Sequence, residues 1–88
     1  MNANKLVARN LRRLRVAKEL SQEALAVDAE IDRTYVSRLE RGLENPTVAV
    51  LERLAEALSA KITDLFAVPK HGEPIPKPLK SGRRPNQR

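Results

Sequence analysis

The stretch from Ser21 to Gly42, SQEALAVDAEIDRTYVSRLERG, decides the fold because it encodes two short capped helices joined by a tight turn. Ser21 and Asp32 each carry a short side-chain oxygen of the kind that accepts hydrogen bonds from the N–H groups opening a helix. Gly42 can adopt the positive φ that releases the chain at the end of the second helix. The pattern predicts helices over about 21–28 and 32–41.

The polar side chains of the second helix share one face. At 100° per residue they fall within one arc of about 140°, opposite Val36 and Leu39. A solvated face on an ordinary amphipathic helix is one interpretation of this pattern. The preceding helix favours another, because a helix braced behind a donor-rich helix across a short turn lets the second enter the major groove of DNA. The outward residues are Arg33, Thr34, Ser37, Arg38 and Arg41.

Two further amphipathic segments flank this pair. The first, about Asn4 to Lys18, and the second, Thr47 to Ser59, each place leucines on one stripe. Thr63 is the expected cap of a short last turn, whose Leu65 and Phe66 are expected to close the core. The sequence thus predicts an all-α, compact five-helix helix-turn-helix domain over residues 1–69.

Composition restricts how this domain is stabilised. The 88 residues include no cysteine, no tryptophan, one tyrosine and one phenylalanine, so the core must be aliphatic, and disulfides and thiolate metal sites are excluded. No apolar run exceeds four residues, so we expect no membrane span and a cytoplasmic, nucleoid-associated bacterial protein.

Charge is concentrated at the end of the chain. Residues 1–69 hold 11 Lys/Arg and 10 Asp/Glu, whereas residues 70–88 hold 6 and 1, so the domain carries +1 and the tail +5. Four of the six prolines are in this tail, which we expect to be disordered. It either adds nonspecific attraction to phosphates or only improves solubility. The charges that would meet phosphates are Lys77, Lys80, Arg83, Arg84 and Arg88.

The chain resembles the helix-turn-helix family of phage repressors, Cro-like proteins and XRE-type bacterial regulators over about Ala3 to Phe66. The motifs carrying the likeness are NLRRLR at 10–15, LSQEALA at 20–26, DRTYVSRLERG at 32–42, NPT at 45–47 and LERLAEAL at 51–58. The DRTYVSRLERG piece is most similar to controller proteins of restriction–modification systems, although phage and plasmid repressors carry similar strings. Two places depart from the family pattern: Glu30 replaces the usual turn glycine, and Leu43-Glu44 follows Gly42 where relatives commonly have basic residues, so we expect fewer phosphate contacts from this loop.

The resemblance implies a role for each polar residue of the pair. Base edges would be read by Arg33, Thr34, Ser37 and Arg38. Phosphates would be met by Gln22, Ser21, Tyr35, Arg41, Asn45 and Thr47, with the Tyr35 ring packed in the core. An ion pair between Arg15 and Glu40 would join the first helix to the third, and we expect it to be partly buried, because an unpaired carboxylate there would be costly.

The function expected is that of a sequence-specific regulator of transcription on double-stranded DNA. It would be a dimeric repressor or autoregulator at a palindromic operator, since one such domain reads few base pairs. Apolar contact in the homodimer would come from Val50, Ala57, Ile62 and Val68, which fit an ordinary core equally well. The alternative is an antitoxin or interaction module that also engages a protein partner through the tail or the helix 47–59. Catalysis is not expected, because the sole histidine, His71, lies in the tail, and no metal or cofactor motif is present.

Overall fold

The structure is a computed structural model that describes residues 2–69 and folds them into four α-helices and one 3₁₀ helix. Its elements are α1 (Ala3–Ala17), α2 (Gln22–Ala29), α3 (Arg33–Glu40), α4 (Val48–Ala57) and η1 (Ile62–Phe66). No strand is present in this range, so the all-α class is confirmed, and the fifth predicted helix is the 3₁₀ turn. The predictions for residues 70–88 lie outside the described residues.

Each α-helix begins at a side-chain cap. Ser21, Asp32 and Thr47, the caps expected from the sequence, accept hydrogen bonds from backbone N–H groups of the first helical turn at 2.9, 2.9 and 3.1 Å. Asn2 caps α1 in the same way at 2.8 Å. These bonds satisfy donors that have no partner within the helix, and they fix where the helices start.

All four α-helices end in the same backbone motif, with a residue of positive φ just past the end. These residues are Glu19 (φ 58°), Glu30 (58°), Gly42 (75°) and Ser59 (53°). After α3, for example, the Gly42 N–H donates to the Leu39 carbonyl and the Leu43 N–H to the Arg38 carbonyl, both at 3.0 Å. This is the Schellman motif, in which two backbone carbonyls of the last helical turn accept hydrogen bonds from N–H groups beyond the helix, and the chain reverses direction. Glu30, which stands where the family usually has a turn glycine, thus adopts the left-handed conformation.

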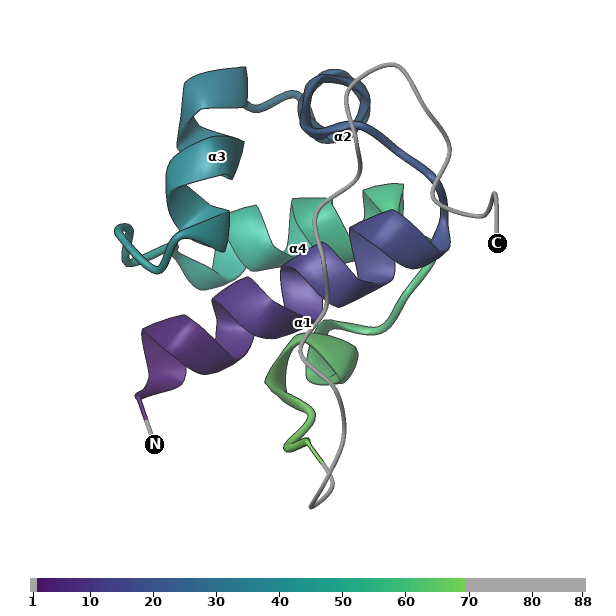
Figure 1. Ribbon diagram of the computed structural model, residues 1–88. Helices are drawn as coiled ribbons and strands as arrows, with labels where there is room; N and C mark the ends of the chain where they lie inside the picture. Colours follow the sequence, from purple (N-terminus) through teal and green to yellow (C-terminus); the bar gives the residue numbers. More distant parts are fainter. Residues whose placement is uncertain (1, 70–88) are drawn as a thin grey trace.

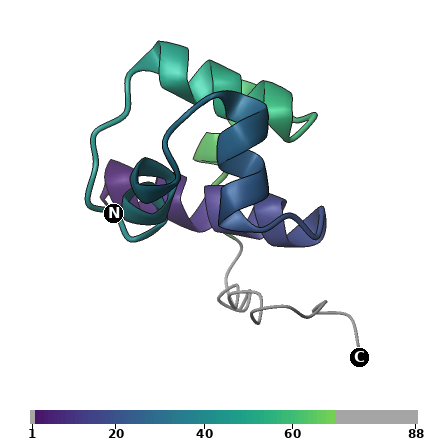
Figure 2. The same cartoon turned by 90° about the horizontal axis from the view of Figure 1, so that it is seen from above.

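The core is a single aliphatic cluster to which every element contributes a fully buried leucine: Leu11, Leu25, Leu39, Leu54 and Leu65. Helix α3 contacts α1 and α2, α2 also contacts α4, and η1 contacts α1 and α4. Helix α2 is seen end-on in Figure 1 and α3 in Figure 2, so the two helices of the motif cross steeply. Helix α3 lies at one edge of the molecule, with one face on the core and the other in solvent (Figure 1).

The last turn differs from the sequence prediction in two respects. It begins after Lys61 rather than at Thr63, because the Asp64 carboxylate accepts from the Lys61 N–H at 3.0 Å and starts the turn earlier. Phe66 is 43% exposed and does not close the core. In a 3₁₀ helix, residues three apart share a face, so Ile62 and Leu65 point inward and Phe66 does not.

A buried amide joins this turn to α1. Asn10 is completely buried, and its Nδ2 donates to the carbonyls of Leu65 and Ala67 at 3.0 and 2.9 Å. Its Oδ1 accepts from Arg9 and Arg13 at 3.3 to 3.4 Å. The side chain thus satisfies carbonyls that the short 3₁₀ turn leaves free, and holds the end of the described chain against α1.

We predict that Glu30→Gly stabilises the protein by roughly 0.5–1 kcal/mol in urea unfolding. Glycine removes the left-handed strain of a Cβ-bearing residue, and the gain is reduced by its greater entropy in the unfolded chain. Glu30→Ala is the matched control, because it removes the same carboxylate but keeps the Cβ. Equal stabilisation by alanine and glycine would show that charge, not backbone conformation, limits stability here.

Candidate nucleic-acid interface

A buried ion pair fixes the orientation of α3. Glu40, the last residue of α3, has a side chain that is 0% exposed, and Arg15 of α1 is 3% exposed. The structure brings them together in a two-pronged contact, with Arg15 Nε donating to Glu40 Oε2 at 2.5 Å and Arg15 Nη2 to Oε1 at 2.9 Å. Arg15 Nη1 also donates to the Leu20 carbonyl at 2.8 Å, so the guanidinium is well satisfied.

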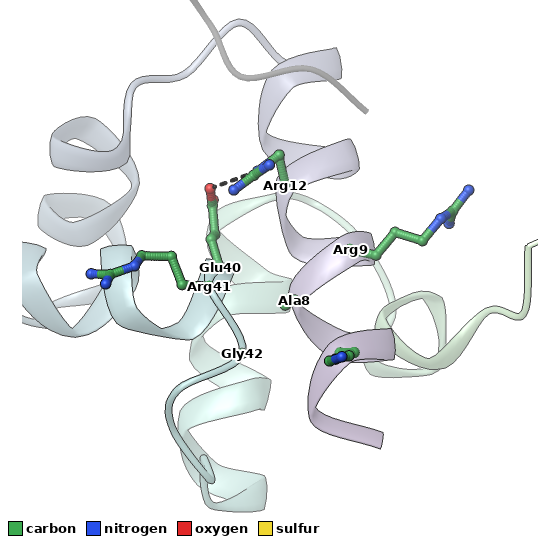
Figure 3. Close-up of a pocket in the computed structure, with 7 residues that line it drawn as sticks. Ala8, Arg9, Arg12, Glu40, Arg41 and Gly42 are labelled. Carbon is green, nitrogen blue, oxygen red and sulfur yellow. Dashed lines mark ion pairs between the residues drawn. The ribbon is translucent and has the colours of Figure 1, made fainter. Parts of the chain in front are cut away.

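Two more residues reach the same carboxylate. Gln22, the first residue of α2, donates from Nε2 to Glu40 Oε1 at 3.1 Å. Arg12 Nε lies 3.5 Å from Oε1, and Figure 3 shows its guanidinium turned toward Glu40. Glu40 is therefore the point at which α1, α2 and α3 are joined by polar contacts. The helix pair behind the outward face of α3 is held by charge as well as by apolar packing.

The outward side of α3, here called the recognition face, consists of Arg33, Thr34, Ser37 and Arg38. Arg33, Thr34 and Arg38 are exposed and Ser37 is half-buried, while Val36 and Leu39 lie on the core side. Among residues 2–69, Arg33 has no ion-pair partner. The face presents guanidinium and hydroxyl donors, the groups that pair with guanine O6 and N7 and with phosphate oxygens.

Arg38 has a partner that the sequence pattern did not predict. Its Nε donates to Glu44 Oε2 at 2.6 Å, and its Nη2 lies 3.4 Å from the Leu43 carbonyl. The Schellman turn at Gly42 causes this contact, because it returns the chain over the last turn of α3. The Arg38 side chain remains 45% exposed and that of Glu44 27% exposed, so the pair lies at the surface.

Tyr35 lies between the recognition face and the core. Its ring is half-buried and packs against the apolar cluster, as the sequence suggested. Burial raises the pKa of its phenol above the ordinary value of 10.0, and the nearby Glu44 carboxylate raises this pKa further because it repels the phenolate. Glu44 thus interacts electrostatically with two residues of α3, Arg38 and Tyr35.

The remaining predicted phosphate ligands lie at helix ends and in the loop before α4. Ser21 and Thr47 are exposed caps whose oxygens accept backbone N–H bonds, which leaves each hydroxyl hydrogen available for donation. Arg41 is exposed. Asn45 accepts from Asn4 Nδ2 at 2.6 Å, which ties this loop to the start of α1.

The residues considered for dimer contact differ in burial. Val50, Ala57 and Ile62 are half-buried against the core cluster, whereas Val68 is 67% exposed. Val48, at the start of α4, is 71% exposed. No helix within residues 2–69 has the length and apolarity needed to span a membrane.

A hollow of about 270 Å³ is lined by residues of α1 and of the end of α3, but its basic side chains do not gather around one point. Arg9 and Arg41 point away from each other and from Glu40 (Figure 3). Among the described residues, no group of three or more His, Cys, Asp or Glu side chains is arranged to hold a metal ion. The recognition face is therefore the stronger candidate site.

Of the two contacts that the sequence analysis did not predict, Arg38–Glu44 and Gln22–Glu40, only the first has a signal in the sequence. A glycine two residues after the end of a helix predicts a Schellman turn, which brings the residues that follow it back to the last helical turn. Glu44, two residues beyond Gly42, is then within reach of Arg38. The bond from Gln22 to Glu40 had no such signal, because it depends on the angle between α2 and α3.

We predict that Glu40→Ala destabilises the protein by about 3–5 kcal/mol in urea unfolding, because Arg15 would be left buried without its partner. Glu52→Ala, which removes an exposed carboxylate of α4, is the control and should change stability by about 0.5 kcal/mol or less. The double variant Arg15→Met/Glu40→Leu should be more stable than Glu40→Ala, since no unpaired charge remains. Equal effects of Glu40→Ala and Glu52→Ala would contradict a stabilising role for the buried pair.

We further predict that Glu44→Gln lowers the pKa of Tyr35 while leaving it above 10.0, because burial persists when the carboxylate is removed. Tyr35 is the sole tyrosine and the chain has no tryptophan, so tyrosinate absorbance reports this group alone. Because the pKa of Tyr35 is higher in the native state than in the unfolded chain, ionisation of the phenol favours unfolding. The contribution of Tyr35 to stability is therefore fully present below pH 10.0 and is lost as the pH rises through the native pKa. An unchanged Tyr35 pKa in Glu44→Gln would place the Glu44 charge away from the ring.

Comparison with known proteins agrees with this geometry. The family model described as a helix-turn-helix domain matches residues 6–66. An uncharacterised HTH-type transcriptional regulator of Sinorhizobium fredii is 43% identical over 65 residues, covering 74% of this chain and 84% of the relative. The crystal structure of the restriction–modification controller protein C.AhdI from Aeromonas hydrophila superposes with a TM-score of 0.70 at 41% identity, covering 72% of this chain and 96% of that one.

A second controller protein, C.Esp1396I, was solved as a tetramer in complex with its natural 35-base-pair operator. It matches with a TM-score of 0.69 at 30% identity, covering 75% of this chain and 87% of that chain. The family model matches most of residues 2–69, and two of these proteins, each more than 40% identical to this chain, are covered over more than two thirds of their own length. The chain belongs to the helix-turn-helix family of XRE-type transcription regulators.

Proposed function

We propose that the chain is a sequence-specific regulator of transcription that binds double-stranded DNA as a homodimer, acting as a repressor or autoregulator at a palindromic operator. The observation that carries this proposal is the recognition face of α3, which offers exposed donors while Glu40 holds the helix rigidly from behind. A rigid donor-bearing helix at the edge of a small domain suits the major groove.

In this proposal the recognition face reads bases. Arg33 and Arg38 pair with guanine O6 and N7, and Thr34 and Ser37 contribute a methyl group or hydroxyls. Two arginines on one short helix restrict the readable sequence to sites with suitably spaced guanines. DNA shape adds to this selection.

Phosphate contacts fix the register of the domain on the duplex. Gln22 donates one Nε2 hydrogen to Glu40 and has a second that can be donated to a phosphate. The carboxylate that holds α3 therefore also orients this amide. The Ser21 and Thr47 hydroxyls act at the N-termini of α2 and α4, where the helix dipole favours an anion. Arg41, Asn45 and the Tyr35 hydroxyl complete the set.

The homodimer follows from the small size of the interface, because one domain reads only a few base pairs and two half-sites multiply selectivity. The similar protein C.Esp1396I is a tetramer on its natural operator, which supports assembly on DNA. Exposed Val48 and Val68 offer apolar surface for contact between protomers. In this proposal residues 1–69 form the DNA-binding domain, and the basic segment 70–88 adds attraction to phosphates. The protein acts on the nucleoid in the cytoplasm and catalyses no reaction.

Selection from a random pool of double-stranded DNA at fixed physiological salt tests the proposal. We expect enrichment of a palindrome that persists when residues 70–88 are removed, because the domain, not the basic tail, carries the sequence information. Retention without a motif, lost together with the tail, would contradict sequence-specific binding and favour a module that acts through a protein partner.

We predict that Arg38→Ala weakens binding to the selected operator by about 1–3 kcal/mol and relaxes one position of each half-site. Arg53→Ala, an exposed arginine of α4, is the control and should leave the motif unchanged. Competition binding followed by a second selection with the variant measures both effects. Uniform weakening on all DNA would instead assign Arg38 to a phosphate.

A further inference from the structure

The loop after α3 places a carboxylate against an arginine of the recognition face. The turn at Gly42 directs the Leu43 N–H to the Arg38 carbonyl at 3.0 Å, and Glu44 then meets Arg38 Nε at 2.6 Å. Arg38 Nη2 faces the Leu43 carbonyl at 3.4 Å. The loop therefore covers one side of the guanidinium, the side formed by Nε and the adjacent hydrogen of Nη2.

Within residues 2–69, Arg38 Nη1 makes no hydrogen bond, and the Arg38 side chain as a whole is 45% exposed. A guanidinium has five N–H donors in a planar fork, and Nη1 with the second hydrogen of Nη2 forms the end of that fork. These two parallel donors suit guanine O6 and N7. Arg38 can therefore bind a base edge end-on while Glu44 still holds Nε.

Glu44 also changes what Arg38 contributes on DNA of any sequence. Nonspecific binding arises from cations that meet phosphates, and a cation already paired with a carboxylate contributes less to it. The carboxylate itself repels phosphates. Arg33, on the same face, has no ion-pair partner among residues 2–69. Pairing with a carboxylate therefore weakens the nonspecific phosphate contacts of Arg38 but not those of Arg33.

We propose that Glu44 is a specificity-determining residue: it holds Arg38 by Nε, keeps this arginine from nonspecific phosphate contacts and presents its Nη1 and Nη2 end to a guanine. This inference rests on the proposed function of the recognition face. Glu44 acts through Arg38 and is a positioning residue. Because both side chains are partly exposed, at 45% and 27%, the contact biases Arg38 and does not lock it.

The test compares wild-type protein with Glu44→Gln on the selected operator and on a scrambled duplex of equal length, across a salt series. We expect the variant to bind the scrambled duplex about 3- to 10-fold more tightly, with a smaller change on the operator, so that the specificity ratio falls. The salt slope on the scrambled duplex should steepen by about 0.9, the value for one added phosphate contact. Glu56→Gln, near the C-terminal end of α4, removes the same charge from an exposed position and is the matched control.

A double variant and an NMR measurement separate positioning of Arg38 from an effect of charge alone. In an Arg38→Ala background, Glu44→Gln should no longer alter the specificity ratio, because the carboxylate has lost the arginine through which it acts. In the free protein, the Arg38 Nε–H should give an exchange-protected NMR signal that is lost in Glu44→Gln.

The outcomes distinguish this inference from the proposed function. If wild type selects a motif but Glu44→Gln has the same specificity ratio as Glu56→Gln, the inference is overturned and the DNA reader stands. Equal tightening on operator and scrambled duplex would likewise overturn it, since Glu44 would then act only as a general charge. If wild type selects no motif, the proposed function fails and the role of Glu44 fails with it.

Discussion

Three helices of this small domain meet at the carboxylate of Glu40, where Arg15 of α1 and Gln22 of α2 donate and Arg12 of α1 approaches. Burying one charge alone costs several kcal/mol, so the carboxylate is stable there only when its partners are in place. Their positions set how α1, α2 and α3 lie relative to one another. Helices packed only through leucines can shift along one another, whereas a bidentate ion pair between them fixes their relative position. The direction in which the recognition face points thus follows from this contact.

Gln22 and Arg38 show how structural and binding roles are combined in few residues. Gln22 braces Glu40 with one hydrogen and keeps another for a ligand at the N-terminus of α2. Arg38 closes the loop after α3 through Glu44 and keeps its outer end free. In both cases an intramolecular hydrogen bond orients the donor before any ligand arrives, so less side-chain entropy is lost on binding.

The sequence predicted the elements well and the contacts between them unevenly. Caps at Ser21, Asp32 and Thr47 and the aliphatic stripes are local patterns, so the helices and the fully buried leucines were predictable. The partnership of Arg15 with Glu40 came from family resemblance, since residues 25 apart share no local rule. Exposure of Phe66 was missed because the last turn is 3₁₀ and not α. The contacts of Gln22 with Glu40 and of Asn10 with the end of η1 depend on interhelical angles, which no pattern along the chain specifies.

The most direct test of the central claim, that the Glu40 contacts aim α3 at the major groove, is a structure of the protein bound to an operator obtained by selection. We expect α3 in the groove, the Arg15–Glu40 pair unchanged, and Arg33 and Arg38 at base edges. A complex in which the recognition face points away from the duplex, or in which α3 rotates after the Glu40 contacts break, would contradict the account.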